Sequence, residues 1–483
     1  MTDARRPSIS DMLDARSVAI VGVSAKMGYY WVHSMLQWPH DLDVWLVSRH
    51  EGEVLGHKIY TSIDQIPSTI DYAIVAVPNR FVEEVIRQLA EKGARGATVF
   101  TSGYSELGTE EGREREERLR DLVHSLPVRV LGPNCMGLCY PKLGFAFMPT
   151  VKRSIGPVGF LSQSGGIAIA VYTAGAESGV GFSKLFSFGN QIDIKPPEIM
   201  RYFTEDDETE VVGVYIEGTR DGRALLDAMV ELSKRKPLVV LKGGRSEEGS
   251  RAASSHTGAL AGSFDIWSAA FRQANVPVVT TIEDMVATLS VFSKCPRPHS
   301  RRVGIVAISG GTSVVYTDLC VDNGLSVPPT SKKTKQRLDP LIKDVGTGLG
   351  NPIDLAADYY QDQTISEVIR IVGEEEQFDS VIIEADVHNI HQMATIMDSL
   401  DVVDYFWKSM AEAGADVTAK HRKPVLVAVP DVAYPEARAR TWEIFVQKGL
   451  PVFRNVSEAI GALSRMCDYY DVRSRRAEGQ ERH

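Results

Sequence analysis

Short apolar runs alternate with amphipathic stretches through the first 145 residues of the chain. Residues 18–23 and 72–77 are β-branched runs with the length of a buried strand, and residues 81–92 repeat apolar side chains at helical spacing before Gly93. Because strands that alternate with helices form parallel sheets, this pattern predicts a Rossmann-like α/β domain. Ligands of such domains bind in the loops that follow the carboxyl ends of the strands. We therefore expect the functional residues of this region in those loops.

The remaining sequence contains one α/β pattern twice. Residues 158–166 resemble residues 303–311, and each segment predicts a strand, a glycine turn and the start of a helix. Several such matches in the same order are typical of a duplicated domain. Three further matches pair residues 214–217 with 381–384, 236–240 with 423–427, and 277–278 with 451–452.

The patterns together predict an α/β protein that begins with a doubly wound, Rossmann-like domain and continues with two tandem copies of another α/β domain. A length of 483 residues agrees with about three domains at ~150 residues each. The predicted limits are residues 1–145 for the first domain, 146–298 and 299–472 for the two copies, and 473–483 for a charged tail.

One segment is present in the first copy of the repeat and missing from the second. His256 lies there among Gly and Ser residues, directly flanked by Ser255, Thr257 and Gly258. Small neighbours leave an imidazole accessible, and their hydroxyl and N–H groups can solvate an anion. Histidine is also a nucleophile that can carry a group covalently. Because the second copy folds without the segment, the pattern favours a chemical role for His256 over a loop histidine without a function.

Polar and glycine residues also follow the predicted strands of the first domain. Gly22 ends the first strand, and Ser24 and Lys26 follow it in a turn that could bring a hydroxyl group, an ammonium group and helix amides to a phosphate. Arg49 comes directly after the second strand. An ordinary strand-to-helix turn and a solvated surface arginine remain the alternative explanation.

Two more turns combine glycine with polar side chains. Asn134 lies in the turn over residues 132–137, where one Pro and two Gly residues allow a tight bend; a purely structural turn between domains would explain it equally. The segment Ser162, Gln163, Ser164 and Gly165 precedes a predicted helix, whose first amides could stabilise a phosphate or an oxyanion.

Glu217 ends a predicted strand of the first flavodoxin-like domain. A carboxylate beside His256 would accept a hydrogen bond from one ring nitrogen and raise the basicity of the other. A strand-end glutamate in a salt bridge is the alternative.

Composition narrows the possible functions. The net charge of −10 argues against a nucleic-acid surface, and no apolar run approaches the ~20 residues of a membrane span. Five scattered cysteines lack zinc-site spacing and predict neither a metal site nor a disulfide framework. We expect a cytoplasmic protein whose partners are neither nucleic acids nor membranes.

With these motifs the chain resembles the NDP-forming acyl-CoA synthetases, relatives of succinyl-CoA synthetase, and above all the α subunit of the ADP-forming acid–CoA ligases. The similarity extends from about Asp14 to Asp471, and it implies that the two tandem copies are flavodoxin-like domains. Its most specific element is the segment 254–262, followed by the turns 132–137 and 162–166.

The resemblance implies roles for the candidate residues. His256 would be phosphorylated during turnover, Glu217 would steady the phosphohistidine, and Ser255, Thr257 and Gly258 would surround it. The phosphate and the thioester would lie near Asn134, Ser162, Gln163, Ser164 and Gly165. Coenzyme A would bind the first domain, near Gly22, Ser24, Lys26, Arg49, Val77 and Pro78.

The implied reaction converts a carboxylic acid, CoA and ATP into acyl-CoA, ADP and phosphate, reversibly, through an acyl phosphate and a phosphohistidine. The sequence contains no ATP-grasp region, so the resemblance implies a separate ATP-grasp β subunit that binds ATP/ADP with Mg²⁺, in an α2β2 assembly. The chain departs from the family in its first glycine loop, which continues into three aromatic residues at 29–31.

Two alternatives belong to other classes of protein. One is a non-catalytic CoA-binding regulatory module that has kept the fold. The other is a serine hydrolase that uses Ser164, although the turn is not a G-x-S-x-G elbow.

Overall fold

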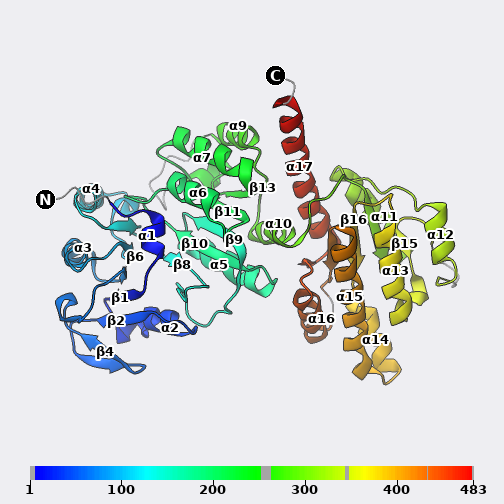
Figure 1. Cartoon of the computed structure of the whole chain (residues 1–483), viewed down its shortest axis with the longest axis horizontal. Helices are drawn as coiled ribbons and strands as arrows, with labels where there is room; N and C mark the ends of the chain where they lie inside the picture. Colours follow the sequence, from blue (N-terminus) through cyan, green and yellow to red (C-terminus); the bar gives the residue numbers. More distant parts are fainter. Residues whose placement is uncertain (1–5, 252–262, 343–347, 432, 481–483) are drawn as a thin grey trace. The chain divides into compact units, whose positions relative to one another are not determined.

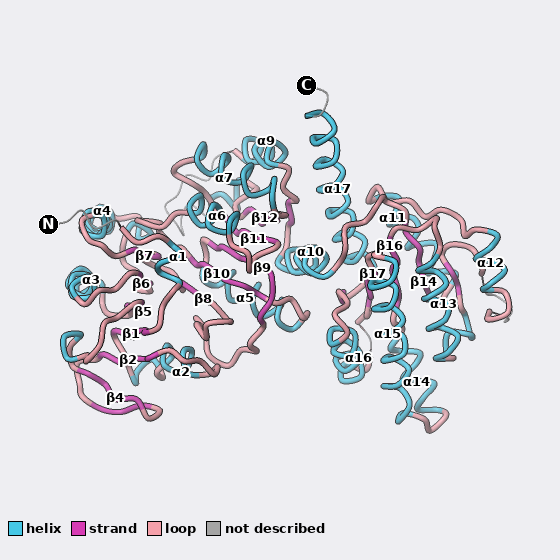
Figure 2. Tube along the Cα trace, viewed as in Figure 1, coloured by secondary structure: helices cyan, strands magenta, loops and turns pink. Residues whose placement is uncertain are grey.

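The structure is a computed structural model that describes residues 6–251, 263–342, 348–431 and 433–480 (Figure 1). The chain divides into two compact units, Met1–Ala176 with Gly181–Ile282 and Glu177–Val180 with Glu283–His483. Each unit consists of sheets covered by helices (Figure 2). In the described part of the chain, every helix is too short or too polar to cross a membrane.

A seven-stranded sheet forms the N-terminal part of the first unit, in the order β3-β4-β2-β1-β5-β6-β7. Every pair in it is parallel except β3 with β4. The β-branched runs form β1 and β5, which are buried at every position, as parallel strands with covered faces require. The strands are β1 Ser17–Val21, β2 Asp43–Val47, β3 Gly52–Val54, β4 His57–Tyr60, β5 Tyr72–Val75, β6 Gly96–Val99 and β7 Arg129–Leu131; the helices are α1 Ile9–Leu13, α2 Tyr30–Leu36, α3 Val82–Glu91 and α4 Glu110–His124.

A six-stranded sheet completes the first unit, in the order β13-β12-β11-β9-β10-β8. Its strands are parallel apart from β8, which pairs antiparallel with β10 at the edge. The strands are β8 Gly137–Cys139, β9 Ile155–Ser162, β10 Phe182–Ser187, β11 Val211–Ile216, β12 Leu238–Lys242 and β13 Val278–Val279; the helices are α5 Gly165–Glu177, α6 Pro196–Glu205, α7 Gly222–Arg235 and α9 Phe264–Ala274.

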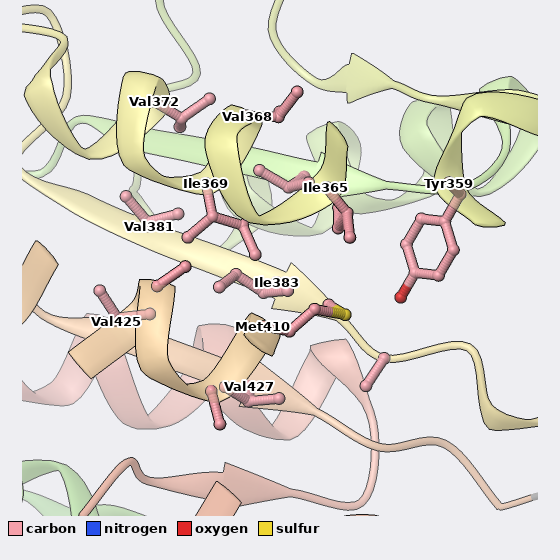
Figure 3. Packing of buried hydrophobic residues seen from close by; sticks show 14 of the residues in the cluster. Tyr359, Ile365, Val368, Ile369, Val372, Val381, Ile383, Met410, Val425 and Val427 are labelled. Atoms are coloured by element: carbon pink, nitrogen blue, oxygen red, sulfur yellow. The ribbon is translucent and has the colours of Figure 1, made fainter. Parts of the chain in front are cut away.

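The second unit contains a five-stranded parallel sheet in the order β15-β14-β16-β17-β18. Ile365, Ile369 and Val372 lie one helical turn apart on α13 and pack with Val381 and Ile383 of β16 in its core (Figure 3). The strands are β14 Val303–Ala307, β15 Ile353–Asp354, β16 Ser380–Glu384, β17 Val425–Ala428 and β18 Val452–Phe453; the helices are α10 Ile282–Lys294, α11 Gly310–Asp322, α12 Lys332–Leu338, α13 Asp362–Glu374, α14 Val387–Ile396, α15 Val403–His421, α16 Pro435–Gln447 and α17 Val456–Gln480.

The sheet topology confirms the duplication. The order β13-β12-β11-β9-β10 of the first unit is repeated as β18-β17-β16-β14-β15 in the second. Both β9 and β14 lead through a glycine turn into a helix, α5 or α11. The fold class is therefore the predicted one, a Rossmann-like sheet followed by two flavodoxin-like sheets.

One of the predicted repeat matches is wrong by two residues. Val158 of β9 pairs with Val211, whereas its counterpart Val303 of β14 pairs with Ser380. Counting along both strands from these pairs, position 217 corresponds to position 386. The counterpart of Glu217 is therefore Asp386 rather than Glu384, because short β-branched strands look alike in sequence and only the inter-strand hydrogen bonds fix their register.

Candidate active site

A cavity of about 1190 Å³ in the first unit lies where β1, β2, β5 and β6 end, and extends to the turn between β9 and α5. Its walls combine backbone from these turns with aromatic side chains from the start of α2. The candidate residues that line it are Gly22, Ser24, Arg49, Val77, Pro78, Asn134, Gln163, Ser164 and Gly165. The structure thus brings together residues that are up to 143 positions apart in the sequence.

Gly22 forms the floor of the cavity at the end of β1. Its φ of +105° is open to glycine only, and a Cβ atom there would lie 2.4 Å from the carbonyl oxygen of Ala76. The Gly22 N–H donates to the Val47 carbonyl at 2.9 Å. The backbone of Gly22 therefore lies directly against that of Ala76 and Val47, which brings the ends of β1, β2 and β5 together beside the cavity.

Arg49 carries positive charge to one side of the cavity. Its guanidinium carbon lies 4.6 Å from the ring centroid of Phe81, and the guanidinium carbon of Arg80 lies 4.7 Å from the same ring. Phe81 lines the cavity, a role that its place at the start of a predicted helix did not reveal. Lys26, in contrast, is exposed and is not among the residues that line the cavity.

The aromatic residues after the glycine loop belong to the cavity wall. Tyr29, Tyr30 and Trp31 all line it, and the Trp31 ring packs edge-on against Phe100 with 5.3 Å between centroids. The Tyr30 hydroxyl donates to the Phe147 carbonyl at 3.1 Å. The three aromatic residues of this loop therefore give the cavity a wall of rings.

Asn134 lies in a left-handed conformation, with φ +59°, in the turn between β7 and β8. Asparagine tolerates this conformation better than most residues. The Asn134 N–H donates to the Thr101 carbonyl, and the Met136 N–H donates to the Ser187 hydroxyl of β10. The turn thus joins the two sheets of the first unit beside the cavity.

The turn between β9 and α5 presents backbone amides to the cavity. Ser162 is fully buried, donates through its hydroxyl to the Ser164 carbonyl at 2.6 Å and accepts from the Ser164 N–H. It shapes the turn rather than the cavity surface. Ser164 and Gly165 line the cavity at the first residues of α5, where helix amides carry partial positive charge.

Among the described residues, no histidine or carboxylate hydrogen-bonds to the Ser164 hydroxyl, which accepts from the Ile167 N–H. A serine nucleophile needs such a base, so the geometry does not favour a hydrolase.

Gln163 connects the cavity to Glu217. Its side-chain oxygen accepts from the Glu217 N–H at 2.8 Å and from the Gly218 N–H at 3.2 Å. Glu217 is 5% exposed, and its carboxylate accepts from the Tyr215 hydroxyl at 3.0 Å. Burial, together with this carboxylate, raises the pKa of Tyr215, so the hydroxyl remains a donor.

Four predicted site residues, Ser255, His256, Thr257 and Gly258, lie outside the described residues. The described chain continues from Lys242, the last residue of β12, to Arg251 and resumes at Ser263, which caps α9 through its hydroxyl. Within the described part of the chain, no cluster of His, Cys, Asp and Glu residues has the arrangement of a metal site.

Comparison with known proteins places this site in a family. Residues 16–141 match the model of a CoA binding domain, and residues 155–292 match that of a succinyl-CoA ligase like flavodoxin domain. The α subunit of ADP-forming acetate–CoA ligase I from Pyrococcus furiosus is 30% identical over 478 residues, which cover 95% of this chain and 97% of that subunit. The α subunit of the ADP-forming ligase II from the same organism is 35% identical over 356 residues, which cover 72% and 77%.

The chain belongs to the family of ADP-forming acid–CoA ligases. The solved acetyl-coenzyme A synthetase 1 of Ca. Korarchaeum cryptofilum, in complex with phosphate and ADP, has the same fold, with a TM-score of 0.81 at 27% identity over 95% of this chain and 96% of that one. Within the ligase family the chain is of the α-subunit type, which implies a separate partner subunit.

The link between Gln163 and Glu217 gives a testable consequence for this ligase subunit. Gln163→Leu should lower the free energy of unfolding by about 2 kcal/mol or more, because two buried N–H groups lose their acceptor. Chemical denaturation followed by circular dichroism measures the change. Gln88→Leu is the matched control, since Gln88 lines the same cavity but bonds only to the exposed Glu84, and it should leave stability within about 0.5 kcal/mol. Equal stability of both variants would contradict the buried role of Gln163.

Proposed function

We propose that this α subunit binds CoA in the cavity and carries the phosphoryl group on His256. The observation that supports the proposal is the continuity of the cavity from the Gly22 and Arg49 loops to the turn at Ser164 and Gly165. The residues that we assign to phosphate binding and those that we assign to the reaction thus line one cavity. We also propose the three-domain division at residues 145, 298 and 472.

The cavity fits CoA by size and by chemistry. Pockets of roughly 300–1,000 Å³ hold drug-sized ligands, and this one exceeds that range. The Arg49 guanidinium supplies positive charge for a phosphate, and the Trp31 and Phe100 rings offer an apolar wall for a pantetheine chain. The α5 amides at Gly165 then lie where the thioester end and its phosphate would be stabilised.

Glu217 and His256 have different roles in the proposed phosphoryl transfer. The Glu217 carboxylate accepts a hydrogen bond from one imidazole nitrogen and so orients the ring and leaves the other nitrogen as the nucleophile. That nitrogen takes the phosphoryl group of ATP, releases ADP, and passes the group to the carboxylate of the acid. The CoA thiolate then attacks the acyl carbon of the acyl phosphate, the C–O bond to phosphate breaks, and acyl-CoA and phosphate leave. Positioning and charge stabilisation dominate such transfers.

We assign the binding of the nucleotide to the partner subunit. We propose an ATP-grasp β subunit that holds ATP/ADP with Mg²⁺, an α2β2 assembly, and a cytoplasmic location for the complex. Co-purification of the chain with a co-expressed β subunit, followed by CoA-thioester formation with a panel of acids, tests this assignment. The panel includes acetate and 4-hydroxybutyrate, for which relatives are named.

The half-reaction without nucleotide tests the α subunit by itself. Incubation with an acyl-CoA and ³²P-labelled inorganic phosphate should give acid-labile, base-stable label on the chain. A chain that binds CoA but takes up no label with any acyl-CoA of the panel would favour the alternative, a CoA-binding regulatory module without catalysis.

A further inference from the structure

Lys242 is a buried lysine next to the candidate active site that does not line the cavity. It is the last residue of β12 and is 2% exposed. Its ammonium group donates to the Glu217 carbonyl at 2.7 Å and to the Gly243 carbonyl, and lies 5.0 Å from the ring centroid of Trp267. Burial of an ammonium group costs free energy unless donors are paired in this way.

These three contacts join both ends of the His256 segment, which we define as residues 243–262, to the strand that carries Glu217. Gly243 is the first residue after β12, on the way to His256. Trp267 is on α9, the helix with which the described chain resumes after that segment. One side chain therefore contacts the first residue of the segment, the helix after it, and the backbone of the residue expected to bind its histidine.

The duplicated domain shows that the fold does not need this lysine. The pairing of Val212 with Leu238 in the first unit corresponds to that of Val381 with Val425 in the second, so Lys242 corresponds to Val429. Val429 is fully buried and apolar. The copy that lacks the histidine segment thus has an ordinary core residue where the copy that contains it has a charge.

Lys236, two residues before β12, is matched by a lysine in the second copy, unlike Lys242. Lys236 and its counterpart Lys423 each donate to two backbone carbonyls, Lys236 to Phe203 and Asp206, and Lys423 to Gly373 and Glu375. A contact that both copies make stabilises the fold that they share. A contact made only in the copy that contains the His256 segment indicates a role connected with that segment.

Gln163, like Lys242, is replaced by an apolar residue in the second copy. Its counterpart in the turn after β14 is Ile308, which has no side-chain acceptor. In the first unit, Gln163 holds the N–H of Glu217 and Lys242 holds its carbonyl. The backbone of Glu217 is therefore fixed from both sides by two polar side chains that the second copy replaces with apolar ones.

We propose that Lys242 is a positioning residue for phosphoryl transfer: it fixes the Glu217 backbone and the two ends of the His256 segment relative to one another. The inference rests on the proposed function of His256. Burial lowers the pKa of Lys242 to about 8, so at neutral pH the group is mostly an ammonium with three N–H donors for its contacts. Lys242 touches neither the cavity nor the expected path of CoA, so it acts through Glu217 and the segment.

The test measures single-turnover labelling of the full chain by ³²P-phosphate at increasing concentrations of an acyl-CoA that labels the wild type. Lys242→Met keeps the aliphatic stem and removes the donors. It should lower the saturating rate about 10- to 100-fold, the usual cost of misplaced reacting groups, and change the half-saturating acyl-CoA concentration less than about 2-fold. The double variant Lys242→Met/Glu217→Gln should lose less than the two single losses combined, because Lys242 acts in part through Glu217.

Lys236→Met is the matched control, since Lys236 makes equivalent carbonyl contacts outside the site. It should lower thermal stability but keep the saturating labelling rate within about 2-fold. Circular dichroism and CoA affinity show whether each variant folds. If Lys242→Met does not fold, Trp267→Leu removes the ring that the Lys242 ammonium group contacts, and it should also slow labelling. A wild-type rate in Lys242→Met, or rate losses that add in the double variant, would overturn the inference. A wild type without label would refute the proposed function instead.

Discussion

His256→Ala is expected to abolish labelling by acyl-CoA and phosphate and to stop CoA-thioester formation by the complex with its β subunit. Removal of a covalent nucleophile leaves no atom to carry the phosphoryl group, so the loss should be on the order of 10⁴-fold or more. Binding of CoA should change little, because the residues to which we assign it, such as Gly22 and Arg49, are unaltered in this variant. Radiolabel counting after alkaline gel electrophoresis and calorimetry with CoA measure the two effects.

His421→Ala supplies the control for this experiment. His421 ends α15, directly before the Lys-Pro strand of the second copy, and has no Gly/Ser-rich segment around it. The variant should label at the wild-type rate. Residual label in His256→Ala with the stability of a phosphohistidine would show that another histidine carries the group.

Gly22→Ala is expected to weaken CoA binding and to destabilise the first unit. At φ +105° a side chain is strained, and its Cβ would lie 2.4 Å from the Ala76 carbonyl oxygen, a backbone atom that cannot move without β5. We expect a loss of about 2–4 kcal/mol in the free energy of unfolding and at least a 10-fold weaker CoA affinity. Chemical denaturation and calorimetry measure both quantities.

Gly28→Ala separates conformational strain from the clash. Gly28 also has a positive φ, +60°, but nothing lies within 4 Å of the Cβ position. The cost should be about 1–2 kcal/mol, with CoA affinity close to that of the wild type. If Gly22→Ala were no worse than Gly28→Ala, the close approach of β1 and β5 would not shape the cavity.

The local pattern of the sequence was sufficient for the elements and for the duplication. Runs such as residues 18–23 and 72–77 became β1 and β5, and the repeated strand and glycine turn became β9–α5 and β14–α11. Hydrophobic spacing depends on which faces are buried, and that is a property of neighbouring residues. The glycine turns that the sequence singled out lie at one cavity, since Gly22, Asn134 and Gly165 all line it, and their roles in binding stay predictions.

The sequence could not tell which of the neighbouring polar residues face the cavity. Ser164 lines it while Ser162, two positions earlier, is buried in the turn, and Ser24 lines it while Lys26 is exposed to solvent. The direction of each side chain in a turn depends on the backbone conformation, which the residue types alone do not determine. The placement of His256 remains a prediction, because it lies outside the described residues.

What the sequence determined by itself is the order of strands and helices, the duplicated pattern and the set of loops that could hold a ligand. Only the tertiary structure decided that Phe81 and Trp31 line the cavity, that Glu217 corresponds to Asp386, and that Gln163 and Lys242 hold the Glu217 backbone. Spacing along the chain fixes which residues share a face of one element. Strand register and contacts between distant elements arise only when the sheets form, because they depend on hydrogen bonds between residues far apart in the sequence.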